Sequence, residues 1–299
     1  MNRVILHEVG MRDGLQMEKQ VVPIETKISW IDQLIDSGAD IIQIGSFVNP
    51  SKVPQMADTD ELFKKYSQVS NSKTMFSGLV LNERGMERGM EAGVNMFCMG
   101  VSASETHSMK NTGMTSGEAC TRIINMAKQV QAAGKVAQVS VQSAFGCGFE
   151  GKIDETRVLE IVDKFLDAGL SKISLADTAG HAYPDQVKRL FGEIKRRKPD
   201  AELACHFHNT YGLGMANVFA AMESGVEYFE SAFGALGGCP FTKTAAGNVA
   251  TEDMVSYWQR NNIRMDLNLD KLVELAKDVA TYFDRVLPGY VYKTGAIKY

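Results

Sequence analysis

The sequence predicts an α/β protein built as a (β/α)8 barrel of the TIM type, with a helical extension at the C-terminus. Three observations lead to this fold class. The chain has 299 residues, an ordinary length for one such barrel with extensions. A short glycine motif recurs ahead of apolar strands, and strand patterns alternate with helical patterns along the chain. This alternation is typical of a parallel sheet with helices outside it, and eight units favour a closed barrel.

The recurring motif is a small or acidic residue, then glycine, then an apolar strand. Its five copies have their glycines at Gly38, Gly93, Gly134, Gly169 and Gly225. Glycine accepts the left-handed conformation that ends many helices, so each copy marks a helix end followed at once by a strand. The five copies therefore indicate one repeated helix and strand unit.

Hydrophobic periodicity places the individual elements. Apolar residues recur at three- and four-residue steps in the helical patterns 24–37, 116–133, 155–168 and 184–198. No Gly-x-Gly-x-x-Gly pattern follows the first strand, which argues against an open dinucleotide-binding sheet. We expect a barrel domain over 1–267 and, packed on it, an extension over 268–299 with a helix at 268–286 and a glycine-containing tail. The expected strands are 4–9, 40–44, 73–80, 95–99, 136–139, 172–175, 202–207 and 227–229.

The composition excludes several classes of protein. Apolar residues make up 44% of the chain and charged residues 23%, which is typical of a globular protein and not of a disordered one. The sequence has no apolar run long enough to cross a membrane. Its net charge of -4 argues against binding to the phosphate backbone of a nucleic acid. We therefore expect neither a membrane nor a nucleic acid as a partner.

The cysteines indicate a reducing environment. They are odd in number and lack Cys-x-x-Cys pairing, which argues against a disulfide framework or a zinc knuckle. A strand pattern begins almost at the first residue and leaves no room for a signal or transit peptide. We expect a cytoplasmic location, with Cys98 in the core and Cys120 packing from a helix. The five cysteines are Cys98, Cys120, Cys147, Cys205 and Cys239.

His206 and His208 lie two residues apart where the seventh strand is expected to end. Alternate residues of a strand point to the same side, so the two imidazoles can converge on one metal ion. The alternative is that both histidines cap the strand end through hydrogen bonds. The rest of the barrel mouth has to decide between these two interpretations.

The barrel fold favours the metal site. Active sites of this fold lie at the C-terminal ends of the strands, and closure makes the seventh strand a near neighbour of the eighth and first. Asp13 follows the first strand, and the eighth loop supplies an amide, for which we choose Asn248. This mixed nitrogen and oxygen shell suits Mg²⁺ or Mn²⁺, and by ligand type also Zn²⁺ or Co²⁺. Arg12 either pairs structurally with Asp13 or stabilises a developing oxyanion.

The loop 234–248 has the composition of a mobile lid. It is glycine-rich at both ends and carries Cys239. A loop of this length in a compact fold is more often functional than a structural turn. Cys239 is either a buried small hydrophobe or an exposed thiol that acts as an acid or base, and we favour the thiol.

Taken in order, the strand-end segments resemble the 3-hydroxy-3-methylglutaryl-CoA lyase family. The match runs in register from about residue 3 to about residue 286. Single segments are moderately specific, whereas the ordered set is very specific. The segments are Arg12-Asp13-Gly14-Leu15-Gln16, Ser46-Phe47-Val48-Asn49-Pro50, Val53-Pro54-Gln55-Met56, Gly146-Cys147-Gly148-Phe149-Glu150-Gly151, Asp177-Thr178-Ala179-Gly180, His206-Phe207-His208, Gly237-Gly238-Cys239-Pro240 and Gly247-Asn248.

The resemblance implies a metal-dependent lyase that cleaves a carbon-carbon bond of a 3-hydroxyacyl-CoA to acetyl-CoA and a keto acid. By position it implies that Arg12 stabilises the thioester enolate and that Cys239 takes part in proton transfer. The ion lowers the pKa of the substrate hydroxyl, and His206 or Asp13 takes its proton. A homodimer or larger assembly is a family-level expectation. The implied metal ligands are Asp13, His206, His208 and Asn248, and the expected substrate contacts are Gln16, Gln43, Ser46 and Asp177.

Gln43 departs from the family pattern, which usually has a glutamate at this position of the second strand. The change keeps the shape and removes the charge, so it indicates reduced activity or a substrate other than hydroxymethylglutaryl-CoA, unless the position tolerates either residue. A Claisen-type synthase shares the Arg-Asp and His-x-His motifs, but the Gly-Gly-Cys-Pro loop resembles the lyases. A metal-dependent hydrolase is a further alternative, but such enzymes normally have the His-x-His pair on the first strand, whereas here the pair lies at the seventh. A non-catalytic metal- or CoA-binding protein is the remaining alternative.

Overall fold

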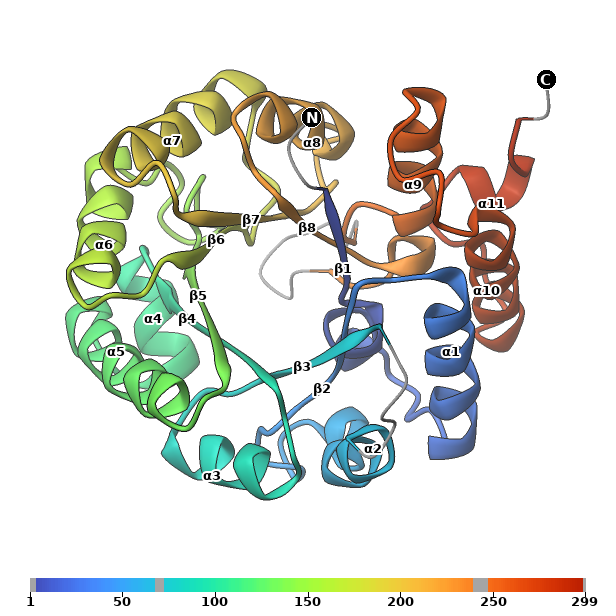
Figure 1. The fold of residues 1–299 in the computed structure, drawn as a ribbon, viewed down its shortest axis with the longest axis horizontal. Helices are drawn as coiled ribbons and strands as arrows, with labels where there is room; N and C mark the ends of the chain where they lie inside the picture. Colours follow the sequence, from blue (N-terminus) through green and yellow to red (C-terminus); the bar gives the residue numbers. More distant parts are fainter. Residues whose placement is uncertain (1–3, 68–72, 239–246, 298–299) are drawn as a thin grey trace.

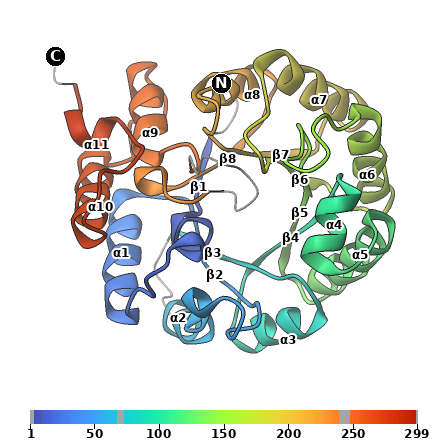
Figure 2. The same cartoon turned by 180° about the vertical axis from the view of Figure 1, so that it is seen from behind.

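The computed structural model forms a closed barrel of eight parallel strands surrounded by helices (Figures 1 and 2). It describes residues 4–67, 73–238 and 247–297. Each strand pairs with its neighbour in the sequence, and the first closes on the eighth, with Ile5 opposite Tyr228. The predicted fold class is therefore confirmed. The strands are β1 (Ile5–Glu8), β2 (Ile41–Ser46), β3 (Met75–Leu79), β4 (Met96–Ser102), β5 (Val136–Gln142), β6 (Lys172–Asp177), β7 (Glu202–Phe207) and β8 (Tyr228–Ser231).

The helices between the strands end as the glycine motif predicts. All five motif glycines have positive φ angles, between 73° and 87°, which L-residues with a side chain rarely adopt. Most of these helices bury apolar residues along one face, such as Ile31 and Leu34 of the first helix. The barrel helices are α1 (Ile24–Ser37), α2 (Thr59–Tyr66), α3 (Glu83–Glu91), α4 (Glu105–Thr112), α5 (Ser116–Ala132), α6 (Glu155–Asp167), α7 (Pro184–Arg197) and α8 (Gly214–Glu223).

Three further helices lie beside α1 on one flank of the barrel (Figure 1). They are α9 (Thr251–Arg260), α10 (Leu269–Tyr282) and α11 (Val291–Thr294). Lys271 on α10 pairs with Asp36 on α1 at 2.6 Å, and the backbone of Asn268 donates to the carbonyl of Ser37 at 2.8 Å. The predicted C-terminal helix is present and packs on the barrel, and the expected tail contains the short helix α11. The domain boundary at residue 267 stays a prediction.

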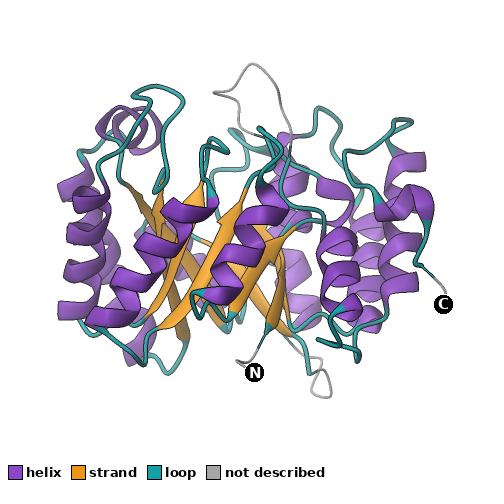
Figure 3. Cartoon of the chain, turned by 90° about the horizontal axis from the view of Figure 1, so that it is seen from above, coloured by secondary structure: helices purple, strands orange, loops and turns teal. Residues whose placement is uncertain are grey.

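The barrel interior changes from apolar to polar along its axis. At the N-terminal end, Ile5, Ile41, Met96 and Tyr228 pack together as a small apolar cluster. Two residues further along their strands, the inward side chains are mostly polar, because β1 carries His7, β2 Gln43, β5 Gln138 and β8 Glu230. The strands cross the molecule between two layers of loops (Figure 3). The apolar cluster thus closes one end of the barrel and leaves a polar interior beneath the other.

The cysteines and the helices of the described residues bear on two further expectations. The four cysteines in the described part of the chain, Cys98, Cys120, Cys147 and Cys205, are free and buried, as expected for a chain without a disulfide framework. Among the helices described, none is both long and apolar enough to cross a membrane.

Candidate active site

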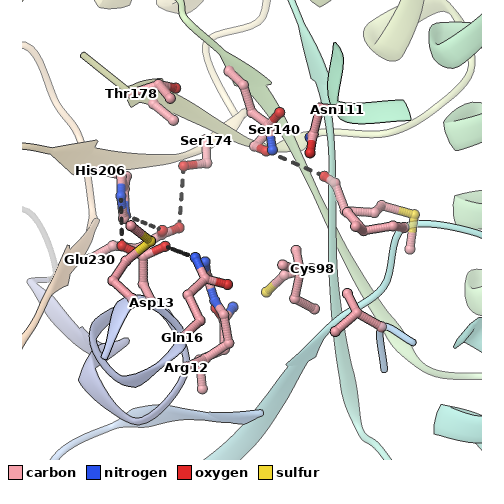
Figure 4. A pocket seen from close by; sticks show the side chains of 18 of the residues that line it. Arg12, Asp13, Gln16, Cys98, Asn111, Ser140, Ser174, Thr178, His206 and Glu230 are labelled. Carbon is pink, nitrogen blue, oxygen red and sulfur yellow. Dashed lines mark hydrogen bonds and ion pairs between the residues drawn. The ribbon is translucent and has the colours of Figure 1, made fainter. Parts of the chain in front are cut away.

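A cavity of about 310 Å³ opens at the C-terminal ends of the strands. Six of the predicted site residues line it, so residues from both halves of the sequence meet at one place (Figure 4). The remaining wall comes from β3 to β6 and from α4, and it combines apolar side chains such as Leu79 and Met99 with polar ones such as Ser140 and Asn111. The six predicted residues are Arg12, Asp13, Gln16, Gln43, His206 and His208.

Asp13, His206 and His208 converge at the cavity floor. The Nε2 atoms of the two histidines lie 3.0 Å apart, and each lies 3.8 Å from Oδ2 of Asp13. Neighbouring ligands held about 2.1 Å from one octahedral ion are roughly 3 Å apart, so the two imidazoles have the spacing of a ligand pair. One ligand atom from each of the three residues lies within 4.8 Å of the others. This arrangement favours a metal site over two strand caps.

Local backbone structure produces this convergence. His206 is the penultimate residue of β7 and lines the cavity, and His208, two residues on, forms a bridge with Asn248. A tight π-helical turn, Gly10–Gly14, follows β1, and the amides of Arg12 and Asp13 both donate to the carbonyl of Val9. The turn therefore holds the Arg-Asp pair directly over the mouth of the barrel.

Asn248 supports Asp13 and offers a further oxygen. Its Nδ2 donates to Oδ2 of Asp13 and to the carbonyl of Leu236, both at 2.9 Å. These two acceptors fix the orientation of the amide, and Oδ1 is buried with no hydrogen-bond partner among the residues described. A buried carbonyl oxygen without a partner is costly unless something binds it. One carboxylate, two imidazoles and this oxygen form a donor set that fits a divalent ion.

The charges around these residues perturb their pKa values. Burial raises the pKa of Asp13, but the positive charge of Arg12 and the two histidines outweighs it and holds the pKa below its usual range. Burial and the neighbouring His206 lower the pKa of His208 to about 4. Burial also lowers the pKa of His206, but the hydrogen bond to Glu230 and the charge of Asp13 raise it overall. The floor therefore provides an ionised carboxylate and at least one neutral imidazole at neutral pH.

Arg12 is held at both ends of its guanidinium. Its Nε donates to Oε1 of Gln43, and one terminal nitrogen donates to Oδ1 of Asp13. Gln16 also donates to this Asp13 oxygen, at 3.3 Å. Arg12 is the only lysine or arginine that lines the cavity as described. The group that can stabilise negative charge on a ligand is therefore fixed in position by Gln43 and Asp13.

Two of the predicted substrate contacts, Ser46 and Asp177, lie apart from the described cavity lining. Ser46 is buried at the end of β2, where its hydroxyl donates to the carbonyl of Leu79 at 3.3 Å. Asp177 is buried and accepts a hydrogen bond from the amide of Ala182, so it braces the loop after β6. Cys239 lies outside the described residues. The structure therefore gives Ser46 and Asp177 contacts with the backbone, and their contact with a substrate stays a prediction.

Sequence reasoning missed the polar groups beneath the floor. Glu230 on β8 accepts from Nε2 of Gln138 at 2.7 Å and lies 3.0 Å from Nδ1 of His206. Burial raises the pKa of Glu230, but the hydrogen bond to His206 and nearby positive charges lower it to about 2. Cys98, expected in the core, is buried but also lines the cavity. The sequence did hold a signal for this layer, because several strands carry a polar residue at the same distance along the barrel axis, namely His7, Gln43, Gln138 and Glu230.

The whole chain has known relatives. It matches the family model described as HMGL-like over residues 3–279. It is 34% identical to a hydroxymethylglutaryl-CoA lyase of Bacillus subtilis, with 96% of this chain and 95% of that protein covered. It is also 35% identical to the (R)-citramalyl-CoA lyase of Chloroflexus aurantiacus, with 99% and 96% covered.

Solved structures agree with this assignment. An HMG-CoA lyase from Acinetobacter baumannii, determined in complex with coenzyme A and 3-methylmalate, is 37% identical with a TM-score of 0.91, over 98% of this chain and 95% of that one. The Bacillus subtilis HMG-CoA lyase structure has a TM-score of 0.93 at 33% identity, with 98% of each chain covered. The fold and site define a metal-dependent barrel lyase. The chain belongs to the HMGL-like family and is an enzyme of the hydroxymethylglutaryl-CoA lyase type.

Proposed function

We propose that this enzyme cleaves a branched 3-hydroxyacyl-CoA, similar to 3-hydroxy-3-methylglutaryl-CoA, into acetyl-CoA and a keto acid. The product would be acetoacetate if hydroxymethylglutaryl-CoA is the substrate. The observation that carries the proposal is the convergence of Asp13, His206 and His208 beside the fixed guanidinium of Arg12. A site for a divalent cation next to a fixed cationic donor suits a reaction that deprotonates a hydroxyl and develops charge on a thioester oxygen.

In this proposal Asp13, His206, His208 and Asn248 hold the ion. A bound Mg²⁺ or Mn²⁺, or alternatively Zn²⁺ or Co²⁺, would lower the pKa of the substrate hydroxyl. In this proposal His206 or Asp13, which lie side by side at the ligand set, takes the hydroxyl proton. The bond between C2 and C3 then breaks, and Arg12 stabilises the enolate that leaves as acetyl-CoA.

Reprotonation of the enolate requires an acid near its α-carbon. The family resemblance assigns this role to Cys239 on the loop after β8, and we keep it as a proposal. The same resemblance supports an acyl-CoA substrate and a dimer or larger homo-oligomer. These assignments rest on the family and not on contacts in the described residues.

Gln43 leaves the choice of acyl group open. A neutral amide accepts from Nε of Arg12 where the family usually has a carboxylate. The change removes one negative charge beside Arg12, so the site has more positive charge available for an anionic acyl substituent. The relatives named for hydroxymethylglutaryl-CoA and for (R)-citramalyl-CoA are about equally similar to this chain, and both acyl groups carry a carboxylate.

A substrate panel tests the proposal. The purified enzyme and Gln43→Glu would be incubated with Mg²⁺ or Mn²⁺ and with hydroxymethylglutaryl-CoA, citramalyl-CoA and longer branched 3-hydroxyacyl-CoA thioesters. We expect acetyl-CoA and one keto acid in equal amounts from at least one of these substrates, and a changed order of preference in Gln43→Glu. If no substrate turns over and Gln43→Glu creates activity, the native protein is a non-catalytic homologue.

The competing condensation reaction has a different product. A Claisen-type synthase would consume acetyl-CoA and a 2-oxo acid and release the free thiol of coenzyme A. Appearance of thiol in that mixture, with no cleavage of any 3-hydroxyacyl-CoA, would replace the lyase assignment with a synthase.

A further inference from the structure

A buried hydrogen-bond network lies directly beneath the candidate metal site. Its centre is Glu230 on β8, a carboxylate whose side chain is only 8% exposed. One oxygen, Oε1, accepts from Nε2 of Gln138 at 2.7 Å and from the hydroxyl of Ser174 at 3.2 Å. The other oxygen, Oε2, lies 3.0 Å from Nδ1 of His206 (Figure 4). The carboxylate is therefore held by three neighbouring barrel strands, β5, β6 and β7.

The contact with Glu230 determines which nitrogen of His206 carries the proton. Because two donors already point at Oε1, the carboxylate has Oε2 free to accept from Nδ1–H of the ring. A neutral imidazole carries one proton, so Nε2 of His206 keeps its lone pair. Nε2 is the atom that faces His208 and Asp13. The network thus presents the ring to the site in the state that a metal ligand requires.

The second histidine has no such support. Nδ1 of His208 is buried without a hydrogen-bond partner among the described residues. Only one of the two imidazoles is therefore held in its tautomer by a carboxylate. Glu230 is therefore the carboxylate that orients one of the two histidines.

We propose that Glu230 is a positioning residue of the metal centre, which holds His206 as the Nδ1–H tautomer and turns Nε2 toward the ion. Gln138 and Ser174 keep the carboxylate from rotating. Partners of this kind also increase the basicity of a ligand, and their loss typically lowers metal affinity by about 10- to 100-fold. The inference rests on the metal site of the proposed function, but it concerns ion binding and not turnover.

Two substitutions of Glu230 separate positioning from packing. Glu230→Leu removes the group that accepts from Nδ1–H of His206. Glu230→Gln keeps a carbonyl oxygen as this acceptor, provided that the side-chain amide of Gln138 flips so that its own oxygen accepts from the new amide. We expect Mn²⁺ affinity, measured from the electron paramagnetic resonance of free Mn²⁺, to fall by about 10- to 100-fold in Glu230→Leu. Glu230→Gln should lie between Glu230→Leu and the native enzyme. Ser174→Ala removes one of the two contacts that hold Oε1 and leaves the contact with His206, so its Mn²⁺ affinity should fall less than that of Glu230→Leu.

The tautomer itself provides a readout that a structural role would not change. The chain has five histidines, so ¹⁵N-labelled imidazole signals can be resolved, and the signal lost in His206→Asn identifies His206. In the metal-free protein, at a pH high enough for the ring to be neutral, we expect protonated Nδ1 in the native enzyme. Glu230→Leu should show protonated Nε2 in a substantial fraction of molecules.

The proposal is overturned if folded Glu230→Leu keeps both the native tautomer and the native Mn²⁺ affinity. If Glu230→Leu does not fold, Glu230→Gln decides, and an affinity within threefold of native overturns the proposal. A native protein that binds no Mn²⁺ overturns both this inference and the proposed function. Binding of Mn²⁺ that depends on Glu230, without turnover of any acyl-CoA, supports the inference and counts against the proposed function alone.

Discussion

Gly237 lies close to Asn248 and Asp13, two of the proposed metal ligands. A Cβ atom at this position would lie 2.6 Å from Nδ2 of Asn248 and 3.4 Å from Oδ2 of Asp13. Ordinary van der Waals contact begins at 3.4 Å, so the amide of Asn248 would have to move by about 0.8 Å. Metal sites tolerate about 0.2 Å in ligand distances. We therefore expect Gly237→Ala to lower Mn²⁺ affinity by about 10- to 100-fold, or about 1.4 to 2.7 kcal/mol.

The backbone effect of this substitution needs a matched control. Gly237 has a φ of +111°, so any side chain there adds a conformational cost of about 1–2 kcal/mol. Gly134, at the end of α5, has a φ of +73°, and no atom of the described residues lies within 4 Å of the place that a Cβ would take, so Gly134→Ala carries a comparable backbone cost alone. Urea denaturation and Mn²⁺ titration of both variants separate the two effects. The reasoning is wrong if Gly237→Ala binds Mn²⁺ as well as the native enzyme, or if Gly134→Ala loses as much affinity.

Four further outcomes follow from the structure. Arg12→Lys should lower kcat by about 100- to 1000-fold in a steady-state assay, because a lysine cannot keep the paired contacts that aim the guanidinium. Burial raises the pKa of Glu252 to about 8 from an ordinary 4.5, so its protonated form stabilises the fold below pH 4.5 and this stability is lost as the pH rises through about 8. In denaturation at several pH values, the native enzyme should therefore lose about 1.4 kcal/mol per pH unit from this group over that window, and Glu252→Gln should lack this contribution. Lys27→Met should lower the free energy of unfolding by about 3 kcal/mol in urea titration, since it removes the buried ammonium that pairs with the partly buried Asp58, 2.7 Å away. Mn²⁺ at 100 times its Kd should stabilise the native enzyme by about 2.7 kcal/mol relative to the metal-free form, and unchanged melting curves would argue against a site that binds only the folded state.

The sequence was sufficient to predict the barrel because each unit carries its own local signal. The five motif glycines, from Gly38 to Gly225, mark helix ends through a conformation that other residues rarely adopt. The strands follow at once, so their number and order could be read without tertiary information. The ends of β4 and β5 extend further than predicted, to Ser102 and Gln142. In β5, Ser140 and Gln142 line the cavity and interrupt the apolar pattern.

The convergence of the proposed metal ligands was predictable for a related reason. His206 and His208 have strand spacing, and Asp13 follows the first strand, so the known closure of a barrel brings them together. Glu230 was not predictable in this way, because its role depends on the depth at which β5, β6 and β8 lie against one another. Polar residues within several strands hint at a buried network, but the partners of one glutamate are known only once the register of the closed sheet is known.

The most direct test of the account is the metal dependence of carbon-carbon cleavage. Metal-free enzyme would be mixed with the preferred acyl-CoA from the substrate panel, with and without Mn²⁺, and acetyl-CoA and keto acid would be quantified by mass spectrometry. The account predicts equal amounts of both products only when the ion is present, and none from folded His208→Ala. Cleavage that continues at the native rate without the ion, or in His208→Ala, would contradict it.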